Sequence, residues 1–242
     1  MRTPRFYENQ PLAGINELTL TDSVFQHAGK VLRMREGDKL ILFNGDGFDY
    51  LAEVIHADKR QMQIRVIESD ANERESSLKI EIGQAISRGE RMDYAIQKAT
   101  ELGCHKVSPL FTERCEVRLT SDRQDKRQRH WQQTAISACE QSMRAIPPEI
   151  STPLSLEAWL KDCDAELKLV LHPHEEAALD TYQAPKSVAL LIGPEGGLSD
   201  NEIALALQYD FKPLRLGPRV LRTETAPVAA CAVLHYLWGD LR

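Results

Sequence analysis

Two short, almost continuous apolar runs in the C-terminal half constrain the fold of this chain most strongly. They are Leu167–His172 (LKLVLH) and Ser187–Gly193 (SVALLIG). Strands of this kind are typical of a parallel sheet that is covered on both faces. Further strands are predicted at 78–86 (LKIEIGQAI), 106–111 (KVSPLF) and 213–217 (PLRLG), and helical segments alternate with them. The pattern predicts an α/β domain.

Helices between these strands are predicted from apolar periodicity and end signals. One follows Gly89, ends at Gly103 and has a single apolar face made of Met92, Ile96, Ala99 and Leu102. A long polar helix is predicted over 123–142, and Ser199 with Glu202 forms a capping box that starts another. The last helix, from about Thr223, is apolar on nearly all sides. It is therefore expected in the core or between subunits, which suggests a dimer interface.

The first 70 residues follow a different pattern. Short β segments are predicted at Lys39–Phe43, Tyr50–Ile55 and Met62–Ile67, with a turn at Asn44–Gly47. They favour a small β-barrel or sheet. The polar stretch Ser69–Ser77 resembles a linker. We therefore expect a β domain over residues 1–70, a linker over 71–77 and the α/β domain over 78–242.

The charge of the chain bears on whether it binds nucleic acids. The net charge of −6 argues against indiscriminate nucleic-acid binding. Residues 114–130 nevertheless carry six Lys/Arg against three acids, and 213–222 carry three arginines and no acid. A solvated helix face is the simpler explanation of the first cluster, so that cluster does not establish RNA binding.

Membrane and metal chemistry are not expected. No apolar stretch approaches the roughly 18 residues of a membrane span, and the N-terminus lacks the apolar core of a signal peptide, so a soluble, untargeted protein is expected. The five cysteines include no CxxC pair, so reduced thiols and no metal site are expected. His172 and His174 form an H-x-H pair without a third ligand, which is weak evidence for a metal.

Two glycine-containing loops each follow a predicted strand and precede a predicted helix. They are Ile192–Leu198 (IGPEGGL) and Leu216–Thr225 (LGPRVLRTET). Ligands bind at the carboxyl ends of parallel strands, so both loops are expected to face one pocket. Neither loop has a phosphate-binding pattern, and Pro194 and Pro218 remove backbone donors. An adenosine with an amino-acid tail suits such loops better than a polyphosphate.

Five segments in order resemble the 16S ribosomal RNA uridine N3-methyltransferases of the SPOUT superfamily, and the resemblance covers essentially the whole chain. The segments are Arg88–Gly103, Pro109–Cys115, Ala138–Arg144, Leu191–Glu202 and Leu216–Ala226. This sequence departs from the family pattern at Met143, where relatives commonly have glycine. The departure concerns the local backbone conformation more than the activity.

The resemblance implies a PUA-like RNA-binding β domain and a SPOUT domain with a trefoil knot, although general topology rules argue against knots. It also implies a cytoplasmic homodimer with active sites at its interface. The expected activity is S-adenosylmethionine-dependent methylation of N3 of a specific uridine in 16S ribosomal RNA of the small subunit. The cofactor-binding residues expected from it are Leu171, His172, Ile192, Gly193, Glu195, Gly196, Gly197, Leu216, Gly217, Leu221, Arg222 and Thr223.

Methyl transfer to N3 requires loss of its proton, so a base or a nearby cation is expected in the pocket. Glu195 and Glu224 are candidates for the base, and Arg114 and Arg222 for stabilising negative charge on the uracil oxygens. Glu195 could instead be a helix N-terminal acid, and Arg222 a structural partner of a carboxylate.

Candidate RNA contacts are polar residues with groups that suit phosphates and bases. They are Arg2, Arg5, Arg33, Arg88, Arg114, Gln141 and Arg144. Each alone is more often a surface charge. Two alternatives remain: a non-catalytic RNA-binding ribosome-assembly factor that retains the fold, and a nucleotide-phosphate enzyme on a doubly wound sheet, against which the missing phosphate loops count.

Overall fold

The computed structural model describes residues 3–117, 119–172, 179 and 182–242. Contacts within the chain define two compact units. The first comprises Met1–Glu75 and Cys139–Pro147, and the second Ser76–Ala138 and Pro148–Arg242. The division after Glu75 falls inside the expected linker 71–77. The segment Cys139–Pro147 was expected in the second domain, but it packs with the first unit.

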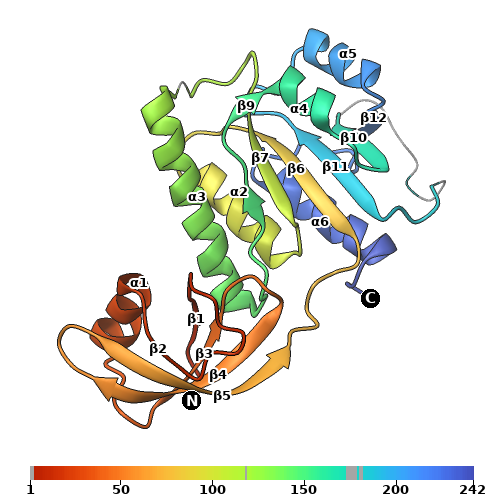
Figure 1. The fold of residues 1–242 in the computed structure, drawn as a ribbon. Coiled ribbons are helices and arrows are strands. Elements are labelled where there is room, and N and C mark those ends of the chain that lie inside the picture. The colour runs from red at the N-terminus through yellow and green to blue at the C-terminus, as the bar shows by residue number, and fades with distance from the viewer. Residues whose placement is uncertain (1–2, 118, 173–178, 180–181) are drawn as a thin grey trace. The chain divides into compact units, whose positions relative to one another are not determined.

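A five-stranded sheet forms the first unit, in the order β1-β3-β4-β5-β2 (Figure 1). The parallel pair β1–β3 is followed by antiparallel pairs. The strands are β1 (Arg5–Tyr7), β2 (Glu17–Thr19), β3 (Lys39–Phe43), β4 (Phe48–Ala57) and β5 (Met62–Ala71), and the helical turns are α1 (Asp22–Phe25) and the π-helix η1 (Gln26–Val31). β3 confirms the predicted segment. β5 extends beyond its predicted end because Ala71 pairs with Phe48, so the linker is shorter than expected.

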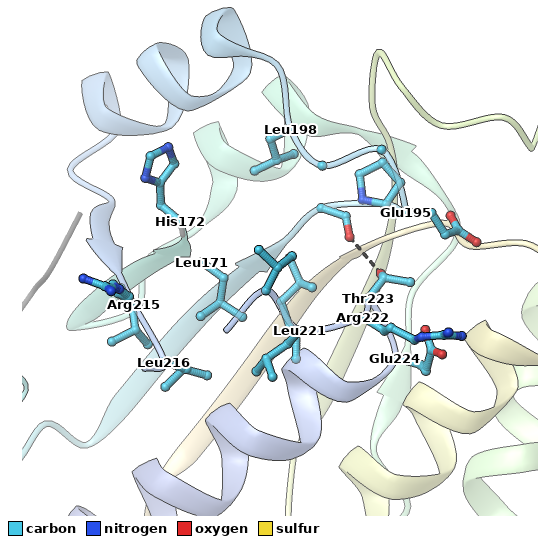
Figure 2. Close-up of a pocket in the computed structure, with 18 of the residues that line it drawn as sticks. Leu171, His172, Glu195, Leu198, Arg215, Leu216, Leu221, Arg222, Thr223 and Glu224 are labelled. Carbon is cyan, nitrogen blue, oxygen red and sulfur yellow. Dashed lines mark hydrogen bonds between the residues drawn. The ribbon is translucent and has the colours of Figure 1, made fainter. Parts of the chain in front are cut away.

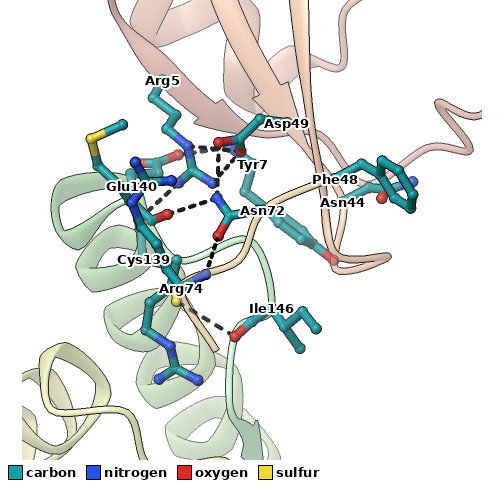
Figure 3. A network of polar contacts seen from close by, with 12 residues as sticks. Arg5, Tyr7, Asn44, Phe48, Asp49, Asn72, Arg74, Cys139, Glu140 and Ile146 are labelled. Atoms are coloured by element: carbon teal, nitrogen blue, oxygen red, sulfur yellow. Dashed lines mark hydrogen bonds and ion pairs between the residues drawn. The ribbon is translucent and has the colours of Figure 1, made fainter. Parts of the chain in front are cut away.

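Polar contacts attach the segment Cys139–Pro147 to this sheet (Figure 3). Arg5 forms an ion pair with Asp49 at 2.6 Å and donates to the carbonyl of Cys139 at 2.9 Å. Asn72 donates to the carbonyl of Met143 at 3.0 Å. The bonds from Arg5 to Cys139 and from Asn72 to Met143 join residues more than 70 positions apart, so periodicity along the sequence could not indicate them.

The second unit contains a seven-stranded sheet in the order β12-β10-β11-β6-β7-β8, with β9 also paired to β7. All of these pairs are parallel, which confirms the predicted α/β class. The strands are β6 (Lys79–Ala85), β7 (Lys106–Phe111), β8 (Glu149–Ile150), β9 (Leu154–Ser155), β10 (Leu167–Leu171), β11 (Ser187–Ile192) and β12 (Lys212–Leu214). β12 ends before Gly217, earlier than predicted, so more of that segment belongs to the following loop.

Helices pack on both faces of this sheet (Figure 1). They are α2 (Glu90–Glu101), α3 (Ser121–Ser142), α4 (Leu156–Asp162), α5 (Asp200–Gln208) and α6 (Thr225–Trp238). Along β11, Leu190 is buried in the cluster with α2 and α6, whereas Leu191 is buried in the cluster with α4 and α5. Because neighbouring strand residues point to opposite faces, both sides of the strand must be apolar. The continuous apolar runs are thereby explained.

Two local predictions have different outcomes. The capping box is confirmed, since Ser199 accepts from the N–H of Glu202 and the Glu202 carboxylate accepts from the N–H of Ser199. For α6, Ala230 and Leu234 are fully buried, whereas Val233 and Tyr236 are exposed, so its expected place between subunits stays a prediction. Within the described residues, no helix is long and apolar enough to cross a membrane.

Candidate functional site

A cavity of about 690 Å³ lies at the carboxyl ends of β10, β11 and β12 in the second unit (Figure 2). Its volume is in the range of small-molecule and cofactor sites. The structure brings every residue expected to bind the cofactor into its lining: Leu171, His172, Ile192, Gly193, Glu195, Gly196, Gly197, Leu216, Gly217, Leu221, Arg222 and Thr223. Arg114 and Glu224 line it as well. His174 lies outside the described residues.

The first loop requires glycine at Gly193 because the chain folds back on itself. A Cβ added there would lie 2.9 Å from the backbone nitrogen of Leu198, closer than real contacts allow. The N–H of Gly197 donates to the carbonyl of Pro194 at 2.8 Å and closes the turn. The capping box then starts α5. The loop is thus held at both ends.

The second loop leaves backbone donors available to a ligand. Gly217 has φ = +76°, in the left-handed region that favours glycine. Among the described residues, the backbone N–H groups of Leu216, Val220 and Leu221 donate no hydrogen bond. Unpaired backbone groups beside a cavity need a ligand or water as partner. The loop therefore provides polar recognition through its backbone.

A buried hydrogen-bond chain joins the two loops. The Thr223 hydroxyl donates to the carbonyl of Gly193 at 2.8 Å, and Figure 2 marks this bond. The same hydroxyl accepts from Nε2 of Gln84 at 3.0 Å, and that amide also donates to the carbonyl of Ala85. Gln84 is 1% exposed. The sequence analysis missed it, although a single amide in the apolar strand IEIGQAI was a usable signal.

These features fit the ligand expected from the sequence. The lining includes the apolar side chains of Leu171, Ile192, Leu214, Leu216, Leu221 and Ala226, which suit an adenine ring. The glycine loops supply backbone donors and acceptors, and the loops contain no lysine that would indicate a polyphosphate.

The carboxylate of Glu195 is already paired. It accepts from the backbone N–H of Arg88 at 3.1 Å and from the Arg91 guanidinium at 2.8 Å. Partial burial by itself raises the pKa of this carboxyl, but the bonds from backbone N–H groups and from Arg91 outweigh it and lower the pKa. A lower pKa makes Glu195 a weaker base. The sequence analysis missed Arg91. Its hydrogen bond holds the Glu195 carboxylate in place.

Glu224 has the opposite environment. Its Oε2 is buried at the cavity and has no hydrogen-bond partner among the described residues. Arg222 is exposed at the same cavity, and no described residue pairs with its guanidinium. Arg114 donates to the carbonyls of Gly196 at 3.0 Å and Leu198 at 3.2 Å, so it supports the first loop. Of the four catalytic candidates, Glu195 and Arg114 are therefore held by hydrogen bonds, whereas the side chains of Glu224 and Arg222 have no partner among the described residues.

The candidate RNA contacts also separate. Arg5 and Arg144 are buried, the first beside Asp49 and the second paired with Glu75 at 2.6 Å. Because burial withdraws both guanidinium groups from the surface, a structural role replaces the expected RNA contact. Exposed positions are Arg33, Arg88, Arg114 and Gln141, and Arg88 also pairs with Glu116. Arg2 lies outside the described residues.

Comparisons with known proteins agree along the whole chain. Residues 74–235 match a family described as RNA methyltransferase domain, and residues 20–67 match one described as RNA methyltransferase PUA domain. The ribosomal RNA small subunit methyltransferase E of Buchnera aphidicola (subspecies Schizaphis graminum) is 38% identical, covering 99% of this chain and 98% of its own. The Bacillus subtilis protein of the same name is 32% identical, with coverages of 93% and 91%.

Two solved structures are similar over their full lengths. A Neisseria gonorrhoeae ribosomal RNA small subunit methyltransferase E, bound to S-adenosyl methionine, is 35% identical with a TM-score of 0.93, and each chain is covered completely. A Legionella pneumophila protein in complex with the cofactor SAM is 43% identical with a TM-score of 0.96, again with complete coverage of both chains.

Proposed function

The chain belongs to the ribosomal RNA small subunit methyltransferase E family, and we propose that it methylates N3 of one uridine in 16S ribosomal RNA. It is an S-adenosylmethionine-dependent methyltransferase of small-subunit ribosomal RNA, with a methyltransferase domain and a PUA domain. The uridine and its N3 atom rest on the five segments that resemble uridine N3-methyltransferases. One observation carries the proposal: residues from three strand ends, all expected to bind the cofactor, line a single cavity.

Bound S-adenosylmethionine supplies an electrophilic methyl group, so the protein chiefly has to position the uridine and remove its N3 proton. Glu224 is the proposed base because its Oε2 is buried at the cavity without a described partner. Arg222, exposed at the same cavity, stabilises the negative charge that develops on the uracil oxygens. Glu195 and Arg114 position the first loop through their bonds to Arg91 and to the loop carbonyls.

RNA binding is assigned to side chains that stay at the surface. Arg33 and Gln141 lie in the first unit, and Arg88 and Arg114 in the second. Guanidinium groups pair well with phosphates and stack on bases. Arg2 remains a candidate on the sequence alone.

Assembly and topology complete the proposal. From the family resemblance we expect a homodimer in the cytoplasm with active sites at the subunit interface. The exposed side chains of Val233 and Tyr236 on α6 support a subunit interface at this helix. Tyr236→Asp should then shift the protein from dimer to monomer in light scattering. The trefoil knot rests on the family resemblance.

Two experiments test the activity. Mass mapping of ribosomal RNA from cells lacking this protein should show loss of one methyl-uridine, which the wild-type chain restores. An unchanged map would refute the proposal. In purified protein, Glu224→Gln should lower turnover about 100-fold or more while calorimetry shows unchanged S-adenosylmethionine affinity.

Glu195→Gln is the matched control for the base. It removes the same charge at the same cavity, but from a carboxylate that Arg91 already holds. We expect it to weaken cofactor binding more than it lowers turnover. Equal loss of turnover in both variants would contradict the assignment of Glu224. Cofactor binding without methylation of any RNA would instead favour the non-catalytic assembly factor.

A further inference from the structure

The first half of α3, from Ser121 to His130, is exposed on nearly all sides. Core contacts of this helix begin only at Trp131 and continue at Ala135 and Ala138. A helix that is polar all round is not held in place by an apolar face. Packing against the core therefore does not explain which side chains this half of the helix carries.

Its charges are segregated around the helix axis. Arg123, Lys126 and Arg127 have spacings of three and four residues, which place them on one side of a helix. Asp122, Asp125 and Arg129 follow the same spacing on another side. We call Arg123, Lys126 and Arg127 the basic stripe. All three are exposed, and none forms an ion pair with a described residue.

The stripe ends at a contact with α2, the helix that also contributes Arg91 to the lining of the cavity. At its end, Nε2 of His130 lies 3.0 Å from the carboxylate of Asp93 on α2, and Figure 1 shows α3 running beside that helix. Arg91, which precedes Asp93 by two residues on α2, lines the cavity and pairs with Glu195. These contacts all lie in the second unit. A substrate seated at the cavity can therefore extend along α2 to the stripe.

We infer that the basic stripe binds the phosphate backbone of the ribosomal RNA whose uridine enters the cavity, an inference that rests on the proposed function. Exposed, unpaired Lys and Arg side chains neutralise phosphates and release counterions. Arg123 and Arg127 are one turn apart, about 6 Å along the axis, so they can contact successive phosphates of one strand. In a chain with net charge −6, such attraction has to come from a local cluster.

The helix offers a matched control. Arg127→Gln removes a charge from the stripe, and Arg129→Gln makes the same change two residues away on the other side of α3. The affinity of each variant is measured for protein-free 16S ribosomal RNA, and for small subunits from cells lacking this protein, as a function of KCl concentration. Calorimetric titration with S-adenosylmethionine checks that each variant remains folded.

Arg127→Gln should weaken RNA binding about four- to fivefold at physiological salt and lower the salt slope by about 0.7 to 0.9. Neutralising all three stripe residues should weaken it about 50- to 150-fold, as the product of three such contacts. Arg129→Gln should stay within about twofold of wild type, because its side chain lies off the stripe. Cofactor affinity should be unchanged in every variant.

Equal effects of Arg127→Gln and Arg129→Gln would overturn the inference, since net charge and not the stripe would then matter. Weakened binding to subunits with unchanged binding to protein-free RNA would place the stripe against a ribosomal protein, which also overturns it. Failure of the proposed function is a separate result: the wild-type protein would bind RNA but methylate no uridine. RNA affinity still tests the stripe in that case.

Discussion

Replacing Thr223 by valine should separate the two cofactor loops while leaving their shapes nearly unchanged. Valine is almost isosteric with threonine but has no hydroxyl. The variant therefore loses the bond to the carbonyl of Gly193, the bond from Gln84 and the longer contact with the Ser87 hydroxyl at 3.3 Å. A buried hydrogen bond contributes about 0.5–1.5 kcal/mol, so the two shorter bonds alone predict a loss of about 1–3 kcal/mol in the free energy of unfolding.

Cofactor affinity should fall in the same variant. Without the shared hydroxyl, the ligand has to supply the free energy that orders the two loops relative to each other. We expect about tenfold weaker S-adenosylmethionine binding, which corresponds to about 1.4 kcal/mol. Thr223→Ser is the control, because it keeps the hydroxyl and should retain most of both properties.

Tryptophan fluorescence suits the unfolding measurement because Trp131, Trp159 and Trp238 all belong to the second unit. Urea titration then reports the unit that contains the cavity, and calorimetry gives the affinity. A Thr223→Val protein within about 0.5 kcal/mol of wild type, with unchanged affinity, would refute the argument that this chain of bonds holds the loops together.

Three further predictions concern other parts of the molecule. Met143 has φ = +69°, so Met143→Gly should stabilise the protein by about 0.5–1 kcal/mol in thermal unfolding, because relief of left-handed strain exceeds the added chain entropy. Burial, together with a hydrogen bond to Asp46, raises the pKa of Tyr50 to about 12. This contribution to stability is present below the unfolded phenol pKa of about 10 and is lost as pH rises through about 12. Asp46→Asn should lower the pKa of Tyr50. This pKa is measured as the midpoint of phenol ionisation in a spectroscopic pH titration, after subtraction of the same titration of the Tyr50→Phe variant. Burial raises the pKa of the Cys139 thiol to about 12, so alkylation followed by mass spectrometry should find the partly exposed Cys115 modified first.

Much of the fold followed from local pattern. The apolar runs at 167–172 and 187–193 predicted strands of a covered parallel sheet, and Ser199 with Glu202 predicted a helix start. Both are confirmed, because a strand or a cap depends on residues within a few positions. The loops at 192–198 and 216–225 were placed at one pocket by the rule that parallel strands end at the same edge.

The position of Met143 shows that a family resemblance can also predict local backbone conformation. The family resemblance implies glycine there, and the left-handed backbone at this position explains why glycine would be favoured. The family resemblance pointed to the position, whereas the dihedral angle supplied the physical reason.

The amino-acid sequence by itself determined the elements, the loops and the family resemblance, since these depend on short-range periodicity and on ordered motifs. Only the tertiary structure decided which charged side chains remain available. Arg5 and Arg144 were expected to be surface cations, yet both are buried and paired with Asp49 and Glu75. Glu195 is paired with Arg91, whereas Oε2 of Glu224 has no hydrogen-bond partner among the described residues. Partners of a charge come from distant segments, and the free energy of burying it depends on those partners, so no local pattern of residues can reveal its role.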